Sequence, residues 1–343
     1  MKEVRLVLVG FGNVGRAFAR LLQRKSSFLE AEYGLTWKIT GIATGRHGMA
    51  IDPQGLDVDQ AITLVENGKS LDVLSKVERP VDMLGFIQAC PGDILFENSP
   101  VNYETGQPAI SHLQAALDKG MHAVTANKGP VVHRYNELTQ LAQEKGKQFR
   151  FESTVMDGAP VFSLHRSTLP GAELLGFTGI LNSCTNLLLE RMEGGETLDE
   201  AVRYGASIGI TETDPSGDID GWDASIKVAA LSTVLMGIPL KPQDVEREGI
   251  RGITQGMLAE AKQADERWKL VCRAKRTENG IHATVKPERV NSSSPLFSVS
   301  GTSSFIVFET DVLPGLGVLE SDPGPETTAF GLLADMLNIY QPK

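Results

Sequence analysis

The chain has 343 residues, 41% of them hydrophobic and 22% charged, which is an ordinary globular composition with length for two domains. A formal net charge of −10 argues against nucleic acid or an anionic membrane as the main partner, and no apolar run reaches membrane-spanning length. Three widely spaced cysteines and the absence of a signal-peptide pattern favour a reduced, cytoplasmic protein over a disulfide scaffold.

The N-terminal segment has the pattern of a dinucleotide site. Residues 4–9 are apolar and β-branched and predict a buried strand, and residues 16–22 have helical periodicity. Between them lies a GxGxxG turn, made of Gly10, Phe11, Gly12, Asn13, Val14 and Gly15. Gly10 permits a tight turn, Gly12 lets the backbone approach a pyrophosphate, and Gly15 lets the helix pack on the strand. We therefore predict a Rossmann-type, doubly wound parallel sheet whose turn binds NAD(P).

The end of the next predicted strand, residues 37–43, bears on the choice of cofactor. A site that prefers NAD usually carries an acid here for the ribose 2′-hydroxyl, but the first acid is Asp52. Arg46 could instead pair with a 2′-phosphate, although an arginine in such a loop could also be simply solvated. The sequence favours NADP over NAD.

Two later strands, at residues 93–97 and 121–125, should end at the same crevice. They lead to Asn98 and Ser99 and to Lys128, which we expect beside the cofactor; a solvated lysine before a Gly-Pro turn is the alternative for Lys128. Helices are expected at 108–119 and 135–145 and a strand at 148–152. The first domain is thus predicted to span residues 1–152, with a C-terminal helical segment, about 311–343, packing back on it.

The second domain, residues 153–310, is predicted to be a mixed α+β layer with helices on one face of the sheet. Its expected helices are 162–168, 187–192, 198–205 and 222–236, and its expected strands are 176–181, 281–286, 296–299 and 304–309. Residues 182–186 form a polar turn before a helix. Cys184 in that turn could be a nucleophile with a lowered pKa, but no histidine lies nearby in sequence, and a small packing residue is the favoured interpretation.

The segment 209–231 is the most unusual part of the chain. It contains five acids and a lysine, namely Glu212, Asp214, Asp218, Asp220, Asp223 and Lys227. Pro215, Gly217 and Gly221 argue against a regular helix in its first part. Crowded carboxylates repel one another unless they bind something cationic, and Asp223 and Lys227 share one helical face.

Three interpretations of this acidic segment are open. It could be a solvated loop, a calcium loop, or a loop that binds a substrate ammonium while Lys227 serves the chemistry. Asp218 and Asp220 match part of an EF-hand loop, but that register places Ser216 first and Lys227 where the bidentate glutamate is required, which argues against calcium.

Three segments together resemble homoserine dehydrogenase: residues 10–15, the Thr-Ala-Asn-Lys segment 125–128, and the acidic signature 212–227, which has every signature position filled. The likeness extends over nearly the whole chain. It implies a Rossmann domain joined to a mixed α/β substrate and dimerisation domain, and NAD(P)-dependent interconversion of L-homoserine and L-aspartate 4-semialdehyde. A regulatory C-terminal domain, present in some members, is not expected. A dehydrogenase of another small amino- or hydroxy-aldehyde and a catalytically silent NADP-binding sensor are the alternatives.

The resemblance also implies roles for individual residues. Lys227 matches the proton donor and Lys128 the second active-site lysine, and Asp223 would orient Lys227 and raise its pKa. Glu212 and Asp218 match positions that hold the ammonium and polar groups of the amino-acid substrate.

Some members bind a monovalent cation, Na⁺ or K⁺, at positions that correspond to Glu152, Val155, Asp157 and Ala159. The chain departs from the family pattern at three places, which are expected near the substrate, the cation and the nicotinamide. These are Ser183-Cys184, Met156-Asp157 and Asp322-Pro323-Gly324. Cys184 is thus a candidate substrate contact and Gly324 a candidate cofactor contact.

Overall fold

The computed structural model of the protein describes residues 1–211 and 214–340; Glu212 therefore lies outside the described residues. The chain forms two compact units. The first contains Met1–Gly158 and the chain from Gly324 onward, and the second is Ala159–Pro323. Within the described part, no helix combines the length and the apolar character that a membrane crossing requires.

The first unit is built on a six-stranded sheet of order β3-β2-β1-β4-β5-β6. Its strands are β1 (Lys2–Val9), β2 (Leu35–Ala43), β3 (Met49–Ile51), β4 (Ile94–Glu97), β5 (His122–Thr125) and β6 (Phe149–Arg150). All neighbours are parallel except β2 and β3. The strand order reverses at β1 and β4, whose last residues Val9 and Glu97 lie opposite each other. The doubly wound sheet is confirmed, and its switch point is where such folds bind ligands.

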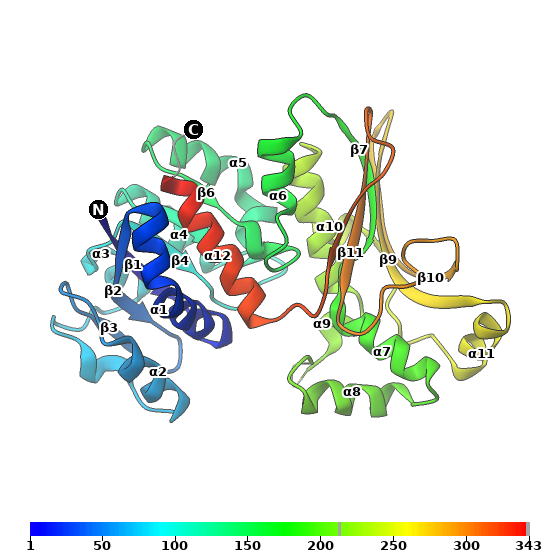
Figure 1. Cartoon of the computed structure of the whole chain (residues 1–343), viewed down its shortest axis with the longest axis horizontal. Coiled ribbons are helices and arrows are strands. Elements are labelled where there is room, and N and C mark those ends of the chain that lie inside the picture. The colour runs from blue at the N-terminus through cyan, green and yellow to red at the C-terminus, as the bar shows by residue number, and fades with distance from the viewer. Residues whose placement is uncertain (212–213, 341–343) are drawn as a thin grey trace. The chain divides into compact units, whose positions relative to one another are not determined.

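Helices flank this sheet, and the last of them is the C-terminal one (Figure 1). They are α1 (Asn13–Tyr33), α2 (Val58–Glu66), α3 (Met83–Ala89), α4 (Ala109–Asp118), α5 (Lys128–Glu144) and α12 (Pro325–Tyr340), with short turns at Leu71–Leu74 and Glu152–Thr154. Helix α12 packs along α1, and Leu332 and Met336 enter the core beside Phe18.

The segment after β6 is fastened to α12. The Asp335 carboxylate accepts from the Glu152 amide (2.8 Å), the Ser153 hydroxyl donates to the Thr328 carbonyl (2.8 Å), and the Thr328 hydroxyl donates to Asp157 (2.8 Å). These bonds hold the chain to the first unit as far as Gly158, beyond residue 152, where the sequence analysis ended that domain.

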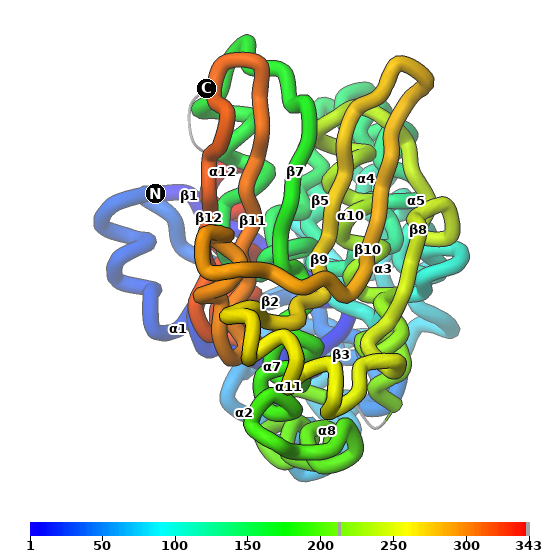
Figure 2. Tube along the Cα trace, turned by 90° about the vertical axis from the view of Figure 1, so that its right-hand side faces the viewer, coloured from blue at the N-terminus to red at the C-terminus, as the bar shows by residue number. Residues whose placement is uncertain are grey.

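The second unit has a mixed sheet of order β12-β11-β7-β9-β10-β8 (Figure 2). Its strands are β7 (Leu174–Ile180), β8 (Glu246–Arg247), β9 (Glu266–Thr277), β10 (Gly280–Asn291), β11 (Ser304–Thr310) and β12 (Leu316–Glu320). Neighbours are antiparallel except β8 and β10. Because β12 pairs with β11, residues 311–323 belong here rather than with the first unit, where the sequence analysis had put them.

The strand predictions in this unit were wrong in two respects. Strands β8, β9 and β12 were not predicted; charged residues occupy much of β9, which pairs with both β10 and β7. The predicted strand 296–299 consists of turns. Leu296 and Val299 are apolar because they are buried in a small cluster with Val271 and Val290, not because they pair with a strand.

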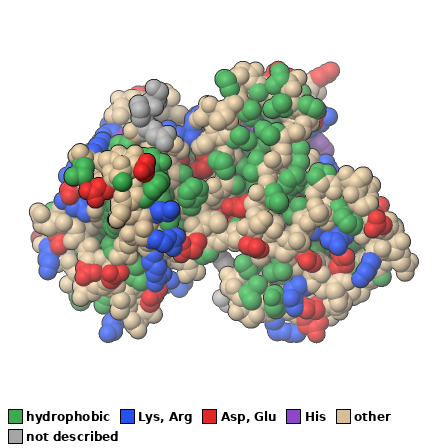
Figure 3. All heavy atoms as spheres, in the orientation of Figure 1, with side chains coloured by type: hydrophobic (Ala, Val, Ile, Leu, Met, Phe, Trp, Pro, Cys, Tyr) green, Lys and Arg blue, Asp and Glu red, His purple; other side chains and the backbone are tan. Residues whose placement is uncertain are grey.

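The helices of the second unit are α6 (Val161–Ser163), which continues as a π-helix (Leu164–Thr168), α7 (Ser183–Glu193), α8 (Leu198–Ser207), α9 (Ser216–Ile219), α10 (Trp222–Leu235) and α11 (Gln255–Gln263), with a short turn at Pro242–Asp244. The acidic segment contains a single helical turn, α9, where no helix was expected. Figure 3 shows hydrophobic side chains gathered over α6 and α10, with charged side chains denser around α8 and α11.

We expect Gly331→Ala to destabilise the first unit. A Cβ at Gly331 of α12 would lie 2.2 Å from the Ser153 hydroxyl and 2.6 Å from the Asp157 carbonyl. Helix propensity alone would favour alanine by about 1 kcal/mol, but overpacking of this contact should reverse the sign and cost about 1–3 kcal/mol. Urea unfolding measures the change in free energy.

Gly45→Ala is the matched control, because Gly45 has no neighbour within 4 Å and no positive φ. It should change the free energy of unfolding by less than about 0.5 kcal/mol. A Gly331→Ala protein as stable as the wild type would show that α12 does not make this close contact.

Candidate functional site

The glycine turn lies at the switch point of the first sheet. Gly10 has φ +92°, and a Cβ there would lie 2.5 Å from the Asn98 carbonyl, so no other residue fits between the ends of β1 and β4. Gly12 is the N-cap of α1, and a Cβ there would have no neighbour within 4 Å. No side chain caps the first amides of α1, which is what an anion-binding helix N-terminus requires.

The end of β4 supplies buried polar atoms that need a partner. The side-chain oxygen and nitrogen of Asn98 and Oε2 of Glu97 are buried without a hydrogen-bond partner among the described residues. Such atoms are costly unless a bound group satisfies them. Oε1 of Glu97 accepts from the Ser99 hydroxyl and lies 3.3 Å from Nδ1 of the buried His112. With the glycine turn, this cradle fits a dinucleotide.

Lys128 begins α5, so the turn expected at Gly129 and Pro130 is the first turn of a helix; the role of Lys128 beside the cofactor stays a prediction. Asn127 is the N-cap: its Oδ1 accepts from the Gly129 amide (2.9 Å) and its Nδ2 donates to the Ser99 carbonyl (3.0 Å). Asn127 therefore ties the Ser99 loop to the start of α5 and places the half-buried Lys128 next to it in the chain.

Arg16 of α1 was not singled out from the sequence, although it directly follows Gly15. Its guanidinium donates to the Phe11 carbonyl (3.0 Å) and to Oδ1 of Asn13 (2.9 Å). Its Nε lies 3.6 Å from the Glu66 carboxylate of α2. Arg16 thereby fastens the turn in its shape.

The two remaining cofactor candidates lie elsewhere in the first unit. Arg46 is exposed in the loop after β2, where the His47 amide donates to the Thr44 hydroxyl (2.7 Å). Gly324 immediately precedes α12, and its amide donates to the Thr327 hydroxyl (2.8 Å). An exposed arginine can reach a phosphate, whereas Gly324 can offer only its backbone.

The second unit gathers a polar cluster around Asn182. Asn182 is the N-cap of α7, and its Oδ1 accepts from the Thr185 amide (2.7 Å). Its Nδ2 donates to Oδ1 of Asp218 (2.6 Å) and to Oδ2 of Asp223 (3.0 Å). One amide thus bridges two carboxylates. The turn predicted for residues 182–186 is shorter in the structure, because Asn182 caps α7 and the helix already begins at Ser183.

Lys227 belongs to the same cluster. Its Nζ donates to the Leu181 carbonyl (2.6 Å) and lies 3.3 Å from Oδ2 of Asp223, one turn earlier in α10. The Lys227 and Asp223 side chains are 14% and 12% exposed, so the pair is only weakly screened by solvent. The ammonium is therefore held at the edge of the cluster with a carboxylate beside it.

The surroundings of the cluster raise the pKa of two of its groups, the Asp218 carboxylate and the Cys184 thiol. Burial, followed by the nearby charge of Asp223, raises the pKa of Asp218, while the Asn182 amide opposes that rise. Burial and then the Asp218 charge raise the pKa of the Cys184 thiol, which argues against a thiolate nucleophile. Cys184 is buried and hydrogen-bonded to Asp218.

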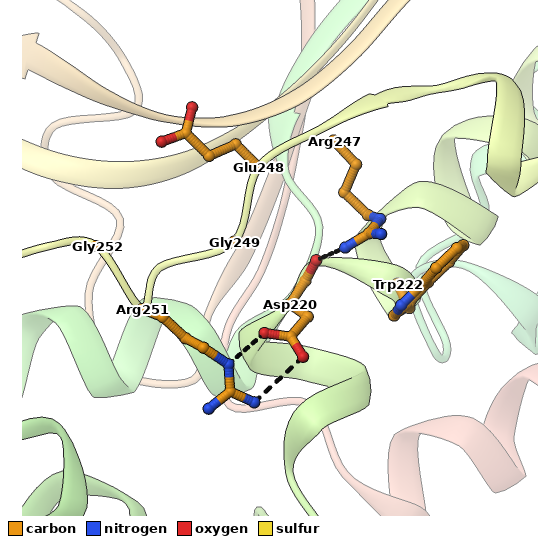
Figure 4. A pocket seen from close by; sticks show the side chains of 7 residues that line it. All are labelled: Asp220, Trp222, Arg247, Glu248, Gly249, Arg251 and Gly252. Carbon is orange, nitrogen blue, oxygen red and sulfur yellow. Dashed lines mark hydrogen bonds and ion pairs between the residues drawn. The ribbon is translucent and has the colours of Figure 1, made fainter.

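Two further acids of the segment, Asp214 and Asp220, have structural partners. Asp214 accepts from the Ser216 amide at the start of α9 (3.0 Å). Asp220 forms an ion pair with Arg251, and its carbonyl accepts from Arg247 (Figure 4). Within the described ranges, no group of three or more His, Cys, Asp or Glu side chains is placed to hold a metal ion.

The residues matched to a monovalent cation site lie along residues 152–159. Glu152 and Val155 are buried, and Asp157 has φ +37°, in the left-handed region that Asp and Asn adopt more readily than other non-glycine residues. Ala159 is the first residue of the second unit.

Comparison with known proteins agrees with this geometry. The family profile described as homoserine dehydrogenase matches residues 160–337, and that of the homoserine dehydrogenase NAD-binding domain matches residues 10–152. An NAD(+)-dependent homoserine dehydrogenase of Pseudomonas canavaninivorans is 35% identical, over 99% of this chain and 97% of the relative. The homoserine dehydrogenase of Methanocaldococcus jannaschii is also 35% identical, over 98% of each chain.

Solved structures give the same result. The crystal structure of a putative homoserine dehydrogenase from Archaeoglobus fulgidus has a TM-score of 0.86 at 27% identity, covering 99% of this chain and all of that one. A hyperthermophilic archaeal homoserine dehydrogenase in complex with NADPH has a TM-score of 0.82 at 29% identity, covering 98% of each chain. This chain belongs to the homoserine dehydrogenase family of NAD(P)-dependent oxidoreductases.

Proposed function

We propose that this protein interconverts L-homoserine and L-aspartate 4-semialdehyde, using NADP in preference to NAD. The observation that carries the proposal is the cluster of Asn182, Asp218, Asp223 and Lys227, in which a held ammonium stands beside two carboxylates. Carboxylates can hold a substrate ammonium, and a lysine can deliver a proton to an aldehyde oxygen. A dehydrogenase of a different small amino- or hydroxy-aldehyde is the alternative.

The residues divide the chemistry between them. Asp218, together with Glu212, binds the ammonium of the amino acid. Lys227 gives its proton to the aldehyde oxygen during reduction and takes it back during oxidation, and Asp223 orients Lys227 and favours its charged form. We propose Lys128, at the start of α5, as a second active-site lysine.

The cofactor supplies or accepts the hydride. The glycine turn, Asn98 and Ser99 hold it in the first unit, with Gly324 as a further backbone contact.

Initial rates with homoserine and each cofactor test this function directly. Turnover of homoserine, with kcat/KM well above that for chain-length analogues and other hydroxy amino acids, is the expected result. A much higher kcat/KM for another alcohol or aldehyde would favour the alternative, and tight cofactor binding without any turnover would favour a silent sensor.

Lys227→Ala should lower kcat by about 10²–10⁴-fold, because the proton donor is lost. The Kd of NADPH should stay unchanged, since the glycine turn is untouched. Steady-state kinetics and fluorescence titration measure the two quantities, with Lys262→Ala of α11 as a surface-lysine control. Near-normal turnover of Lys227→Ala would remove this lysine from the mechanism.

Asn182→Ser should move the acid limb of the kcat/KM profile to higher pH. Asp218 must be ionised to hold an ammonium, so activity is present above its pKa and lost below it. The Asn182 amide lowers that pKa, and serine keeps the helix cap but loses the bridging amide, so the pKa should rise further. The profile of kcat/KM against pH measures the shift.

Ser183→Ala, one residue further along α7, keeps the amide bridge and should leave the acid limb in place. If Asn182→Ser also leaves it in place, Asp218 is not the group that titrates on the acid side.

Arg46→Ala should weaken NADPH about 10- to 100-fold and leave NADH nearly unchanged, as expected for the loss of a charge-assisted bond to the 2′-phosphate. Fluorescence titration with both cofactors gives the two Kd values. The relative from Pseudomonas canavaninivorans is named NAD(+)-dependent, so the preference of this chain has to be measured. Equal weakening of both cofactors would show that Arg46 does not read the 2′-phosphate.

The proposal includes a monovalent cation, Na⁺ or K⁺, bound by residues 152–159, with backbone carbonyls supplying much of the coordination. Rates measured in K⁺, in Na⁺ and in a bulky organic cation at constant ionic strength test it. Equal rates in all three would argue against a functional cation.

We also propose that the protein forms a homodimer through its second sheet. The face that carries Thr178, Phe305, Val307 and Leu319 is partly exposed, and no helix lies in front of the upper part of these strands in Figure 2. Sedimentation velocity should give twice the chain mass, and a monomer would refute the proposed homodimer.

Three buried, free cysteines support a cytoplasmic location.

A further inference from the structure

The two bridged carboxylates are joined by a short turn. Asp218 belongs to the single helical turn α9, whereas Asp223 and Lys227 belong to α10, which spans 14 residues. Between them, Gly221 has φ +79° and is the N-cap of α10. Helix α10 is fixed by its buried residues, but α9 is too short to be stable by itself. The Asn182 amide holds the Asp218 carboxylate (2.6 Å), but the backbone of α9 needs further contacts to keep its position.

Residues 247–250, which are the last residue of β8 and the three residues after it, contact this turn (Figure 4). The Arg247 guanidinium donates to the Asp220 carbonyl and lies 3.8 Å above the centre of the Trp222 ring. The Ile250 amide donates to the Ile219 carbonyl (2.9 Å). Three contacts thus come from residues 247–250 to residues 219–222.

Gly249 allows the approach. A Cβ on Gly249 would lie 2.3 Å from the Ile219 carbonyl and 2.7 Å from Cα of Asp220, so a larger residue would push the turn away. Residues 247–250 are themselves anchored, because Arg247 pairs with Val285 of β10 and the Glu248 amide donates to the Val285 carbonyl (2.8 Å). Strand β10 pairs with β9 along its whole length and provides a rigid base.

Arg251 makes a different kind of contact. Its guanidinium pairs with the Asp220 carboxylate, but the two side chains are 56% and 33% exposed. Exposed ion pairs contribute little, whereas a stacked arginine bonded to a backbone carbonyl is less screened. Beside these side chains lies an open pocket of about 410 Å³, so shortening either arginine leaves no enclosed cavity and should not prevent folding.

We propose that Arg247 and Gly249 are positioning residues that hold α9, and with it Asp218, against the fixed helix α10. This inference rests on the proposed function, in which Asp218 binds the substrate ammonium. Releasing the turn displaces Asp218 but leaves Asp223 and Lys227 on α10. Substrate binding should therefore suffer, and the proton transfer should not.

Arg247→Ala should raise the KM for homoserine at least tenfold while kcat falls less than about threefold and the Kd of NADPH stays within twofold. Arg247→Lys, which keeps a donor for the carbonyl, should recover part of the loss, and Gly249→Ala should raise KM like Arg247→Ala. Arg251→Ala is the matched surface-arginine control and should change KM by less than about fivefold. An unchanged KM for Arg247→Ala, or a lower kcat at constant KM, would overturn the proposal, because a merely less stable enzyme loses active fraction and not substrate affinity.

Amide hydrogen exchange separates this inference from the proposed function. In Arg247→Ala, amides of residues 216–221 should exchange at least tenfold faster, while those of 224–235 stay as in the wild type. Exchange needs no substrate, so a wild type that fails to oxidise homoserine would refute the function and still leave the positioning role of Arg247 testable. Homoserine turnover by the wild type with unchanged exchange in Arg247→Ala would refute the positioning role alone.

Discussion

One side-chain amide, that of Asn182, accounts for the arrangement of the polar cluster in the second unit. Asp218 and Asp223 are close enough to repel each other, and both are largely removed from water. Nδ2 of Asn182 offers each carboxylate a donor, while Oδ1 of the same residue caps α7. The cluster therefore depends on Asn182, whose side-chain nitrogen and oxygen both have hydrogen-bond partners. Lys227 adds one positive charge, 3.3 Å from Oδ2 of Asp223, the same oxygen that accepts from Asn182.

The first unit solves a different problem, which is to bring backbone close to a ligand. Gly10 packs against the Asn98 carbonyl, and Arg16 restrains the turn from the helix side. The cost is a set of buried polar atoms on Glu97 and Asn98 that only a bound group can satisfy. Rigid backbone with unpaired donors and acceptors is the form expected of a preorganised cofactor site.

Local patterns predicted much of this, and contacts between distant residues explain what was missed. The glycine turn could be found from sequence because strand, turn and helix are contiguous, and the Asp223–Lys227 pair because it spans one helical turn. The Asn182 bridge joins residues 36 and 41 positions apart, and nothing in the sequence marks such a pairing. Strand β9 and the Arg247 contacts were not predicted for the same reason, because each depends on a partner elsewhere in the chain.

Helix α12 has a consequence for how the protein is made. The core of the first unit requires Leu332 and Met336, yet the whole second unit, Ala159–Pro323, is encoded before them. On the ribosome, the second unit is synthesised before the first unit can be completed, and α1 lacks its partner helix until α12 has emerged. Translation that stops before α12 should therefore leave an apolar surface on the first unit that chaperones recognise.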